Sequence, residues 1–458
     1  MTRKPAEPTS LAGHRTLGQA AAAVRGGALS PVTLVEEAMA AAVEHQHLNA
    51  IAHLDVDAAL TAARELEQEA AAGRFRGPLH GVPVTVKELY AVAGVAIRAG
   101  TRAPLPQLTA NANDDATCVA RLRAAGALVL ATTNMVEIAL GITGENSWTG
   151  DVRNPYDPTR QAGGSSSGAA VAVATGIGLA ALGTDTAGSI RIPAALCGVV
   201  GVKPTHGLVP LDGALPLSPT CDHGGPLART VTDARLLLDV LTEGAVTGSP
   251  PSPSGPWVLG VPRDHLRGAL DAPVREEFEQ LLERAAAAGA QVVDITPAHL
   301  DDALTVYTPL VRAEAAYVHR GALVTHPEGF SPGIRTVLEE GRAVPAVRYL
   351  AARQARRDLR AGLAATFERV DALVLPTTPV PAPPLGPQEV QVESGRVSHR
   401  DAFLHLTVAF SFAGVPAVTL PYAVVEGLPL GVQVVTAAGA DRRALDVAAW
   451  LEGRTLER

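Results

Sequence analysis

Lys87 is the first side chain whose type and position could support chemistry. It ends the alternating apolar stretch GVPVTVKEL (81–89), and only Lys4, Lys87 and Lys203 are lysines in a chain of 458 residues that otherwise uses arginine. A lysine held on an apolar strand can lose its proton, whereas an arginine keeps its proton at any working pH. The alternative is a structural lysine that reaches solvent from the end of a strand, and we expect a structural role for Lys203 in GVKPTHG.

Two serine-bearing segments follow. GGSSSG (163–168) precedes the helix-forming AAVAVAT, and GTDTAGSIRIPAALCG (183–198) leads through small residues to Ser189, where a short helix can begin. The unpaired N–H groups at a helix start can hold a developing oxyanion. The alternatives are a flexible loop for the first segment and a tight turn for the second.

One serine motif is misleading. Gly164–Gly168 matches GxSxG with Ser166 at its centre. This nucleophile elbow requires a strand directly before it, but the proline-containing loop RNPYDPTRQA stands there. We therefore expect the match to be fortuitous.

Cofactor and metal motifs are weak. Gly176–Ala181 fits the dinucleotide pattern loosely, without the acidic residue that should follow about 20 positions later. His45 and His47 point to different faces of a helix, and three scattered cysteines form no CxxC site. The sequence thus predicts neither a cofactor nor a metal.

Composition excludes several classes of function. Hydrophobic residues make up 47% and charged residues 18% of the chain, which argues against disorder. A net charge of −8 and 3% aromatic residues disfavour a nucleic-acid partner. No secretory signal is visible at the start, and the most apolar stretch (168–183) is shorter than a bilayer span. We predict a cytoplasmic protein with no membrane partner.

The elements that must position these residues are short apolar runs alternating with helices. Helices are expected from Pro31, over 116–125 and over 273–288, and buried strands over 127–133 and 372–378. Residues 416–435 read as a hairpin and a last helix starts near Arg442. The pattern predicts an α/β fold with a large, mostly parallel sheet covered by helices on both faces. We expect one domain over 1–458, with 245–256 as a surface loop.

Taken together, these segments resemble the amidase signature family. The likeness includes GVPVTVKEL, GGSSSG and GTDTAGSIRIPAALCGVVGVKPTHG in order, then GGPLARTVTDA, DALVLPTTPVPAPPLG, AGVPAVTLP and GLPLGVQVV. It extends over nearly the whole chain. The resemblance implies a mixed sheet flanked by helices, and a Ser–cis-Ser–Lys triad that cleaves amides.

The resemblance also implies a role for each residue. Ser189 would be the nucleophile, Ser165 the bridging serine after a cis peptide bond, and Lys87 the base. The oxyanion hole would consist of the N–H groups of Thr186, Ala187, Gly188 and Ser189, with Asp185 and Arg191 as braces. Gly141, Ile142 and Thr143 would line the substrate site.

Three positions depart from the family's usual pattern. Ala187 and Ser167 stand where glycine is usual, and Glu88 stands where aspartate is usual. Ala187 retains its N–H and only adds a methyl group that narrows the pocket. None of the three replaces a residue of the implied triad.

The predicted function is therefore hydrolysis of a small-molecule carboxamide to a carboxylate and ammonia or an amine. One alternative is the glutamine-hydrolysing subunit of a tRNA-dependent amidotransferase, whose characteristic substrate-side segment is missing from 305–325. Another is a non-catalytic binding module on the same fold. The sequence names neither the amide nor an oligomeric state.

Overall fold

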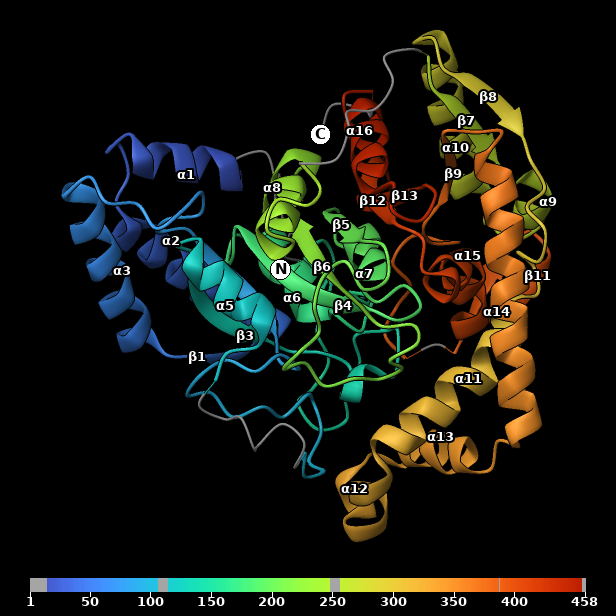
Figure 1. Cartoon of the computed structure of the whole chain (residues 1–458), viewed down its shortest axis with the longest axis horizontal. Coiled ribbons are helices and arrows are strands. Elements are labelled where there is room, and N and C mark those ends of the chain that lie inside the picture. Colours follow the sequence, from blue (N-terminus) through green and yellow to red (C-terminus); the bar gives the residue numbers. More distant parts are fainter. Residues whose placement is uncertain (1–14, 106–113, 248–255, 387, 455–458) are drawn as a thin grey trace, which may run out of the picture.

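The computed structural model describes residues 15–105, 114–247, 256–386 and 388–454 (Figure 1). The loop predicted at 245–256 lies outside the described residues over 248–255, so the single-domain organisation stays a prediction. No helix in the described ranges combines the length and the apolar character needed to cross a membrane.

An eleven-stranded sheet runs through the molecule in the order β1-β3-β2-β4-β6-β5-β12-β13-β9-β7-β8. Its strands are β1 (Ile51–Leu54), β2 (Pro83–Lys87), β3 (Leu128–Thr133), β4 (Ala180–Asp185), β5 (Val200–Lys203), β6 (His223–Ala228), β7 (Val258–Val261), β8 (Gln291–Asp294), β9 (Ala372–Pro376), β12 (Ala417–Val425) and β13 (Leu428–Val435). A separate two-stranded sheet pairs β10 (Glu389–Val392) with β11 (Gly395–Ser398).

The predicted mixed sheet is confirmed, but it is less parallel than the sequence suggested. Parallel pairing is confined to β3-β2-β4 and β9-β7-β8, and the six other neighbouring pairs among the described strands are antiparallel. The central strands β6 and β5 and the hairpin β12–β13 account for the difference. An antiparallel neighbour needs only a short turn, whereas a parallel one needs a crossover.

Helices surround this sheet (Figure 1). They are α1 (Leu17–Arg25), α2 (Pro31–Glu44), α3 (Val56–Ala71), α5 (Thr117–Ala124), α6 (Ser167–Thr175), α7 (Arg191–Leu196), α8 (Val231–Leu241), α9 (Arg263–Leu266), α10 (Ala272–Ala287), α11 (Ala303–Val318), α12 (Arg320–Thr325), α13 (Pro332–Arg342), α14 (Ala346–Phe367), α15 (His399–Ala413) and α16 (Asp441–Glu452). Short 3₁₀ turns are η2 (Gln46–Leu48), η3 (Glu137–Ala139) and η4 (Pro327–Gly329).

Both faces of the sheet are covered, as predicted. Along β4, Ala180 and Leu182 join the apolar cluster that contains α8 and α16, whereas Ala181 joins the cluster that contains α6. Every residue of α6 is buried. This alternation arises because successive side chains along a strand point to opposite faces of the sheet. The packing of α6 on one of these faces places its start beside the carboxyl ends of β2 and β4.

Local signals placed several elements correctly. The Ser30 hydroxyl accepts the N–H of Val32 at the start of α2, with Pro31 in the first turn. The hairpin joins Ala417 to Val435, and α16 begins at Asp441. Capping chemistry and hairpin spacing were therefore recognisable in the sequence.

Candidate active site

Lys87 lies at the carboxyl end of β2, between β3 and β4, with no exposed surface. Its Nζ contacts Ser165 Oγ at 2.7 Å, Thr184 Oγ1 at 2.8 Å and Ser166 Oγ at 3.0 Å. The Ser166 hydroxyl donates to the Thr184 carbonyl at 3.1 Å, so Ser166 can only accept from the amine. The Ser165 hydroxyl therefore remains available to donate to the lone pair of a neutral Lys87.

Burial changes the acid–base behaviour of this amine. It lowers the pKa of Lys87 from 10.5 to about 7, although the negative charges of Asp185 and Asp222 oppose the shift. A buried amine loses hydration that its charged form needs. Lys87 is consequently available as a neutral base near pH 7, which distinguishes it from a lysine that reaches solvent.

The serine loop leads into the start of α6. The Gly164–Ser165 peptide bond is cis, as the resemblance implied. Ser165 and Ser166 are fully buried, and the Ser166 Oγ also accepts the Thr184 N–H at 3.2 Å. Because no strand directly precedes Ser166 and its hydroxyl is committed, the elbow motif is fortuitous, as expected.

Ser189 lies between β4 and α7 and is 5% exposed. Its carbonyl accepts the Ser166 N–H at 3.1 Å, which joins the two serine segments through their backbones. Among the described residues, no hydrogen bond connects the Ser189 hydroxyl to Ser165. The structure thus unites Lys87 with Ser165, while proton transfer between the two serines stays a prediction.

Asp185 and Arg191 brace the Ser189 loop, as predicted. Both side chains are fully buried, with Arg191 Nε 3.0 Å from Asp185 Oδ2. Burial alone would raise the pKa of Asp185, but the charge and hydrogen bonds of Arg191 outweigh it and hold that pKa below its usual value. Removing either partner of this buried ion pair would leave the other charge uncompensated and would destabilise the loop.

The Asp185 carboxylate also bonds one of the N–H groups that we predicted for the oxyanion hole. The Gly188 N–H donates to Asp185 Oδ1 at 2.8 Å, so it is committed to bracing the loop. Within the described chain, the N–H groups of Thr186, Ala187 and Ser189 donate to no other group. Glycine is also required at position 188 by the shape of the turn. Its φ is +134°, and a Cβ on this residue would lie only 2.7 Å from Thr407 Oγ1.

A cavity of about 640 Å³ opens at this loop. Thr186, Ala187 and Ser189 form one part of its wall, and the predicted segment Gly141–Thr143 forms another. The rest comes from remote helices, including Tyr307, Val311 and Arg312 of α11 and His399 and Arg400 of α15.

Sequence reasoning missed several of these residues. Thr184 lies inside the quoted GTDTAGS motif, where its position beside the lysine strand could have indicated a contact. Asp222 lies in CDHGGPL, whose acidic residue received no role. Tyr307 and Arg312 gave no signal, because only the fold brings α11 to this wall.

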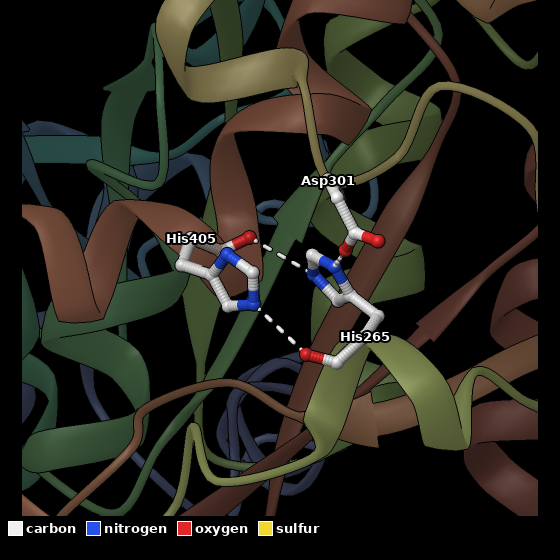
Figure 2. A group of neighbouring side chains, drawn as sticks. All are labelled: His265, Asp301 and His405. Carbon is white, nitrogen blue, oxygen red and sulfur yellow. Dashed lines mark hydrogen bonds and ion pairs between the residues drawn. The ribbon is translucent and has the colours of Figure 1, made fainter. Parts of the chain in front are cut away.

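A second polar cluster combines His265 of α9, His405 of α15 and Asp301, which precedes α11 (Figure 2). Each imidazole Nε2 bonds the other residue's carbonyl, at 3.1 and 2.9 Å, and the rings stack 3.9 Å apart. His265 Nδ1 lies 2.5 Å from Asp301 Oδ1, whereas two ligands of one tetrahedral zinc ion lie about 3.3 Å apart. In this arrangement the cluster is a hydrogen-bonded contact between helices.

Comparison with known proteins identifies the family of this chain. The Amidase family model matches residues 33–445. The chain belongs to the amidase family. A crystal structure described as an amidase covers 96% of this chain and 100% of its own, with 51% identity and a TM-score of 0.93. The family therefore makes this chain an enzyme that acts on C–N amide bonds.

Curated relatives within the amidase family differ in their names. A glutamyl-tRNA(Gln) amidotransferase subunit of Symbiobacterium thermophilum is 34% identical, with 92% of this chain and 93% of the relative covered. A 2-amino-5-chloromuconic acid deaminase of Comamonas testosteroni is also 34% identical, with 96% of each covered. The family is thus shown, while the individual substrate belongs to the proposal below.

Proposed function

We propose that this amidase hydrolyses a small carboxamide through an acyl-enzyme on Ser189, with Ser165 and Lys87 as the proton relay. The observation that carries the proposal is the 2.7 Å contact between Lys87 Nζ and Ser165 Oγ. It lies in a buried cluster whose backbone is bonded to that of Ser189.

The steps follow from the positions of the donors and acceptors. Ser189 Oγ attacks the amide carbon as its proton passes to Ser165, whose own proton passes to neutral Lys87. The carbonyl oxygen becomes an oxyanion, which the N–H groups of Thr186, Ala187 and Ser189 stabilise. The C–N bond then breaks as the relay returns a proton to the leaving nitrogen. Water releases the carboxylate by the same route in reverse.

A lysine suits this relay because its proton affinity matches the working pH. With a pKa of about 7, roughly half of the Lys87 side chains are neutral at pH 7. A serine hydroxyl is a weak nucleophile until a positioned base takes its proton. The buried amine supplies that base without a histidine.

The cavity supports a small-molecule substrate. A volume of about 640 Å³ lies within the range of about 300–1,000 Å³ typical of small-ligand pockets. The wall carries acidic Glu137 and Glu145 together with basic Arg312 and Arg400. A polar amide that presents both kinds of hydrogen-bonding group fits such a wall better than a long hydrocarbon chain does.

The names of the relatives favour a second candidate, in which the chain hydrolyses glutamine as one component of a tRNA-dependent assembly. Coverage of 92% of this chain by such a relative supports it. The 51% identity to a structure described simply as an amidase favours the first candidate. A non-catalytic module is disfavoured, since Lys87, Ser165 and Ser189 are all retained.

The test is ammonia release from a panel of carboxamides, glutamine included, by the purified chain alone. We expect turnover of a small amide and its loss in Ser189→Ala. Treatment with a fluorophosphonate followed by peptide mass spectrometry should place the label on Ser189. Label on Ser166, or turnover of glutamine only after a partner protein is added, would contradict the proposal.

A further inference from the structure

Thr186 separates two cavities. It lines the 640 Å³ cavity with Ser189, and it also lines a second one of about 340 Å³ together with Thr184 and Asp222. Its hydroxyl points to the second side, where it donates to Asp222 Oδ1 at 2.6 Å. The side chain of Thr186 is therefore tethered behind the loop that faces the substrate.

Asp222 is a rigid anchor for this tether. Its other oxygen, Oδ2, accepts the N–H groups of Leu217 and Ser218, each at 2.9 Å. The residue is only 5% exposed. A carboxylate fixed by two backbone donors can hold the Thr186 hydroxyl, and with it the adjacent N–H, in one position.

Asp222 also interacts electrostatically with ionisable groups from several elements. They are Lys87 on β2, Tyr90 after it, the neighbouring Cys221, and Tyr307 and Glu314 on α11. Of these, only Lys87 is a cation when protonated. The negative charge of Asp222 consequently acts on the amine that we assign as the base, in addition to the larger effect of Asp185.

We infer that Asp222 is a positioning residue, which holds the Thr186 N–H in the oxyanion hole and adds a negative charge to the surroundings of Lys87. The inference rests on the proposed function and assigns Asp222 no contact with the substrate. It gives a role to an acidic residue that is buried close to the site and that, among the described residues, forms no ion pair.

The direction of the electrostatic effect can be worked out. Burial raises the pKa of Asp222 to about 7, although its three hydrogen bonds lower it. Part of the Asp222 population is therefore ionised in the pH range in which Lys87 titrates. An ionised Asp222 favours the protonated amine, so removing its charge makes Lys87 lose its proton at lower pH.

The experiment compares the pH dependence of kcat/KM for wild type and Asp222→Asn. We expect the acid limb to move to lower pH by up to about one pH unit, because the variant lacks a negative charge that favours the protonated amine. The control is Asp233→Asn, because Asp233 is also buried and accepts the N–H groups of Leu17 and Gly18 instead. It should leave the pH midpoint unchanged.

A second pair of variants tests the tether without altering the carboxylate. Thr186→Val removes the hydroxyl and should lower kcat about 10- to 100-fold with KM nearly constant, because the oxyanion exists only after attack. Thr186→Ser retains the hydroxyl and should recover most of that loss.

The outcomes separate this inference from the proposed function. An active wild type whose acid limb stays in place in a folded Asp222→Asn, or a Thr186→Val with normal kcat, overturns the inference alone. If Asp222→Asn does not fold, the Thr186 pair decides. A wild type that turns over no amide, or one that Ser189→Ala leaves active, overturns the proposed function instead.

Discussion

Replacement of Lys87 by arginine tests whether the lysine acts as a base or only as a buried cation. In the folded chain the pKa of Lys87 is lowered from 10.5 to about 7. A shift of roughly 3.5 units corresponds to about 5 kcal/mol. It increases the neutral fraction at pH 7 from roughly one in 3,000 to about one half.

Arginine cannot reproduce this, because its pKa exceeds 12 and it stays protonated when buried. We expect Lys87→Arg and Lys87→Ala to lose activity alike, by about 10²–10⁴-fold, the usual contribution of a general base. Wild-type kcat/KM should rise with pH through a midpoint near 7, since only the neutral amine accepts a proton.

The assay is amide hydrolysis by wild type and both variants between pH 6 and pH 10, with folding checked by circular dichroism. Lys203→Arg is the matched control. Lys203 is also fully buried with its pKa lowered to about 7, but within the described part of the chain its amine donates only to the carbonyls of Pro204 and Val415. Activity in Lys87→Arg above about a tenth of wild type, or a flat wild-type profile, would refute the reasoning.

The same geometry supports three further predictions. Gly188→Ala should lower kcat at least about 10-fold, because a Cβ would lie 2.7 Å from Thr407 Oγ1 at φ +134°; kinetics with a melting curve will check it. Lys87→Met should be inactive yet about 2 kcal/mol more stable to urea at pH 6, because losing three hydrogen bonds of about 1 kcal/mol each offsets only part of the 5 kcal/mol. The unfolded chain binds more protons between pH 7 and 10.5, so wild type gains stability as pH rises; the advantage of the variant should disappear slightly above pH 8 and be reversed near pH 10. Dialysis against a chelator should leave amide hydrolysis unchanged, and loss restored by a divalent ion would contradict the mechanism.

The parts of the site that sequence reasoning found are those determined by short segments. Lys87, Ser165 and Ser189 stood out because a rare lysine, a Gly-Ser loop and a run of small residues each constrain the backbone locally. Their mutual contact could not be derived from those segments. It came from the family resemblance, and the structure shows one part of it, the hydrogen bond between Lys87 and Ser165.

The remaining features depend on long-range pairing. Strand β6 inserts between β4 and β5, an order that no local sequence pattern indicates. This insertion makes the mixed sheet less parallel than we predicted. The commitment of the Gly188 N–H to Asp185 depends on a side-chain rotamer. Likewise, His265 and His405 are 140 positions apart and meet only because α9 packs near α15.

The origin of the cavity wall has a consequence for how such enzymes diversify. The residues that we propose break the amide bond lie between Lys87 and Ser189, whereas much of the opposite wall belongs to α11 and α15, more than 100 residues later. Mutations in those later helices can reshape the wall without displacing any group of the relay. Reactivity and substrate selectivity can therefore be inherited separately. Grafting residues 303–318 and 399–413 from another member of the family is a route to a new substrate preference that leaves the proposed proton relay in place.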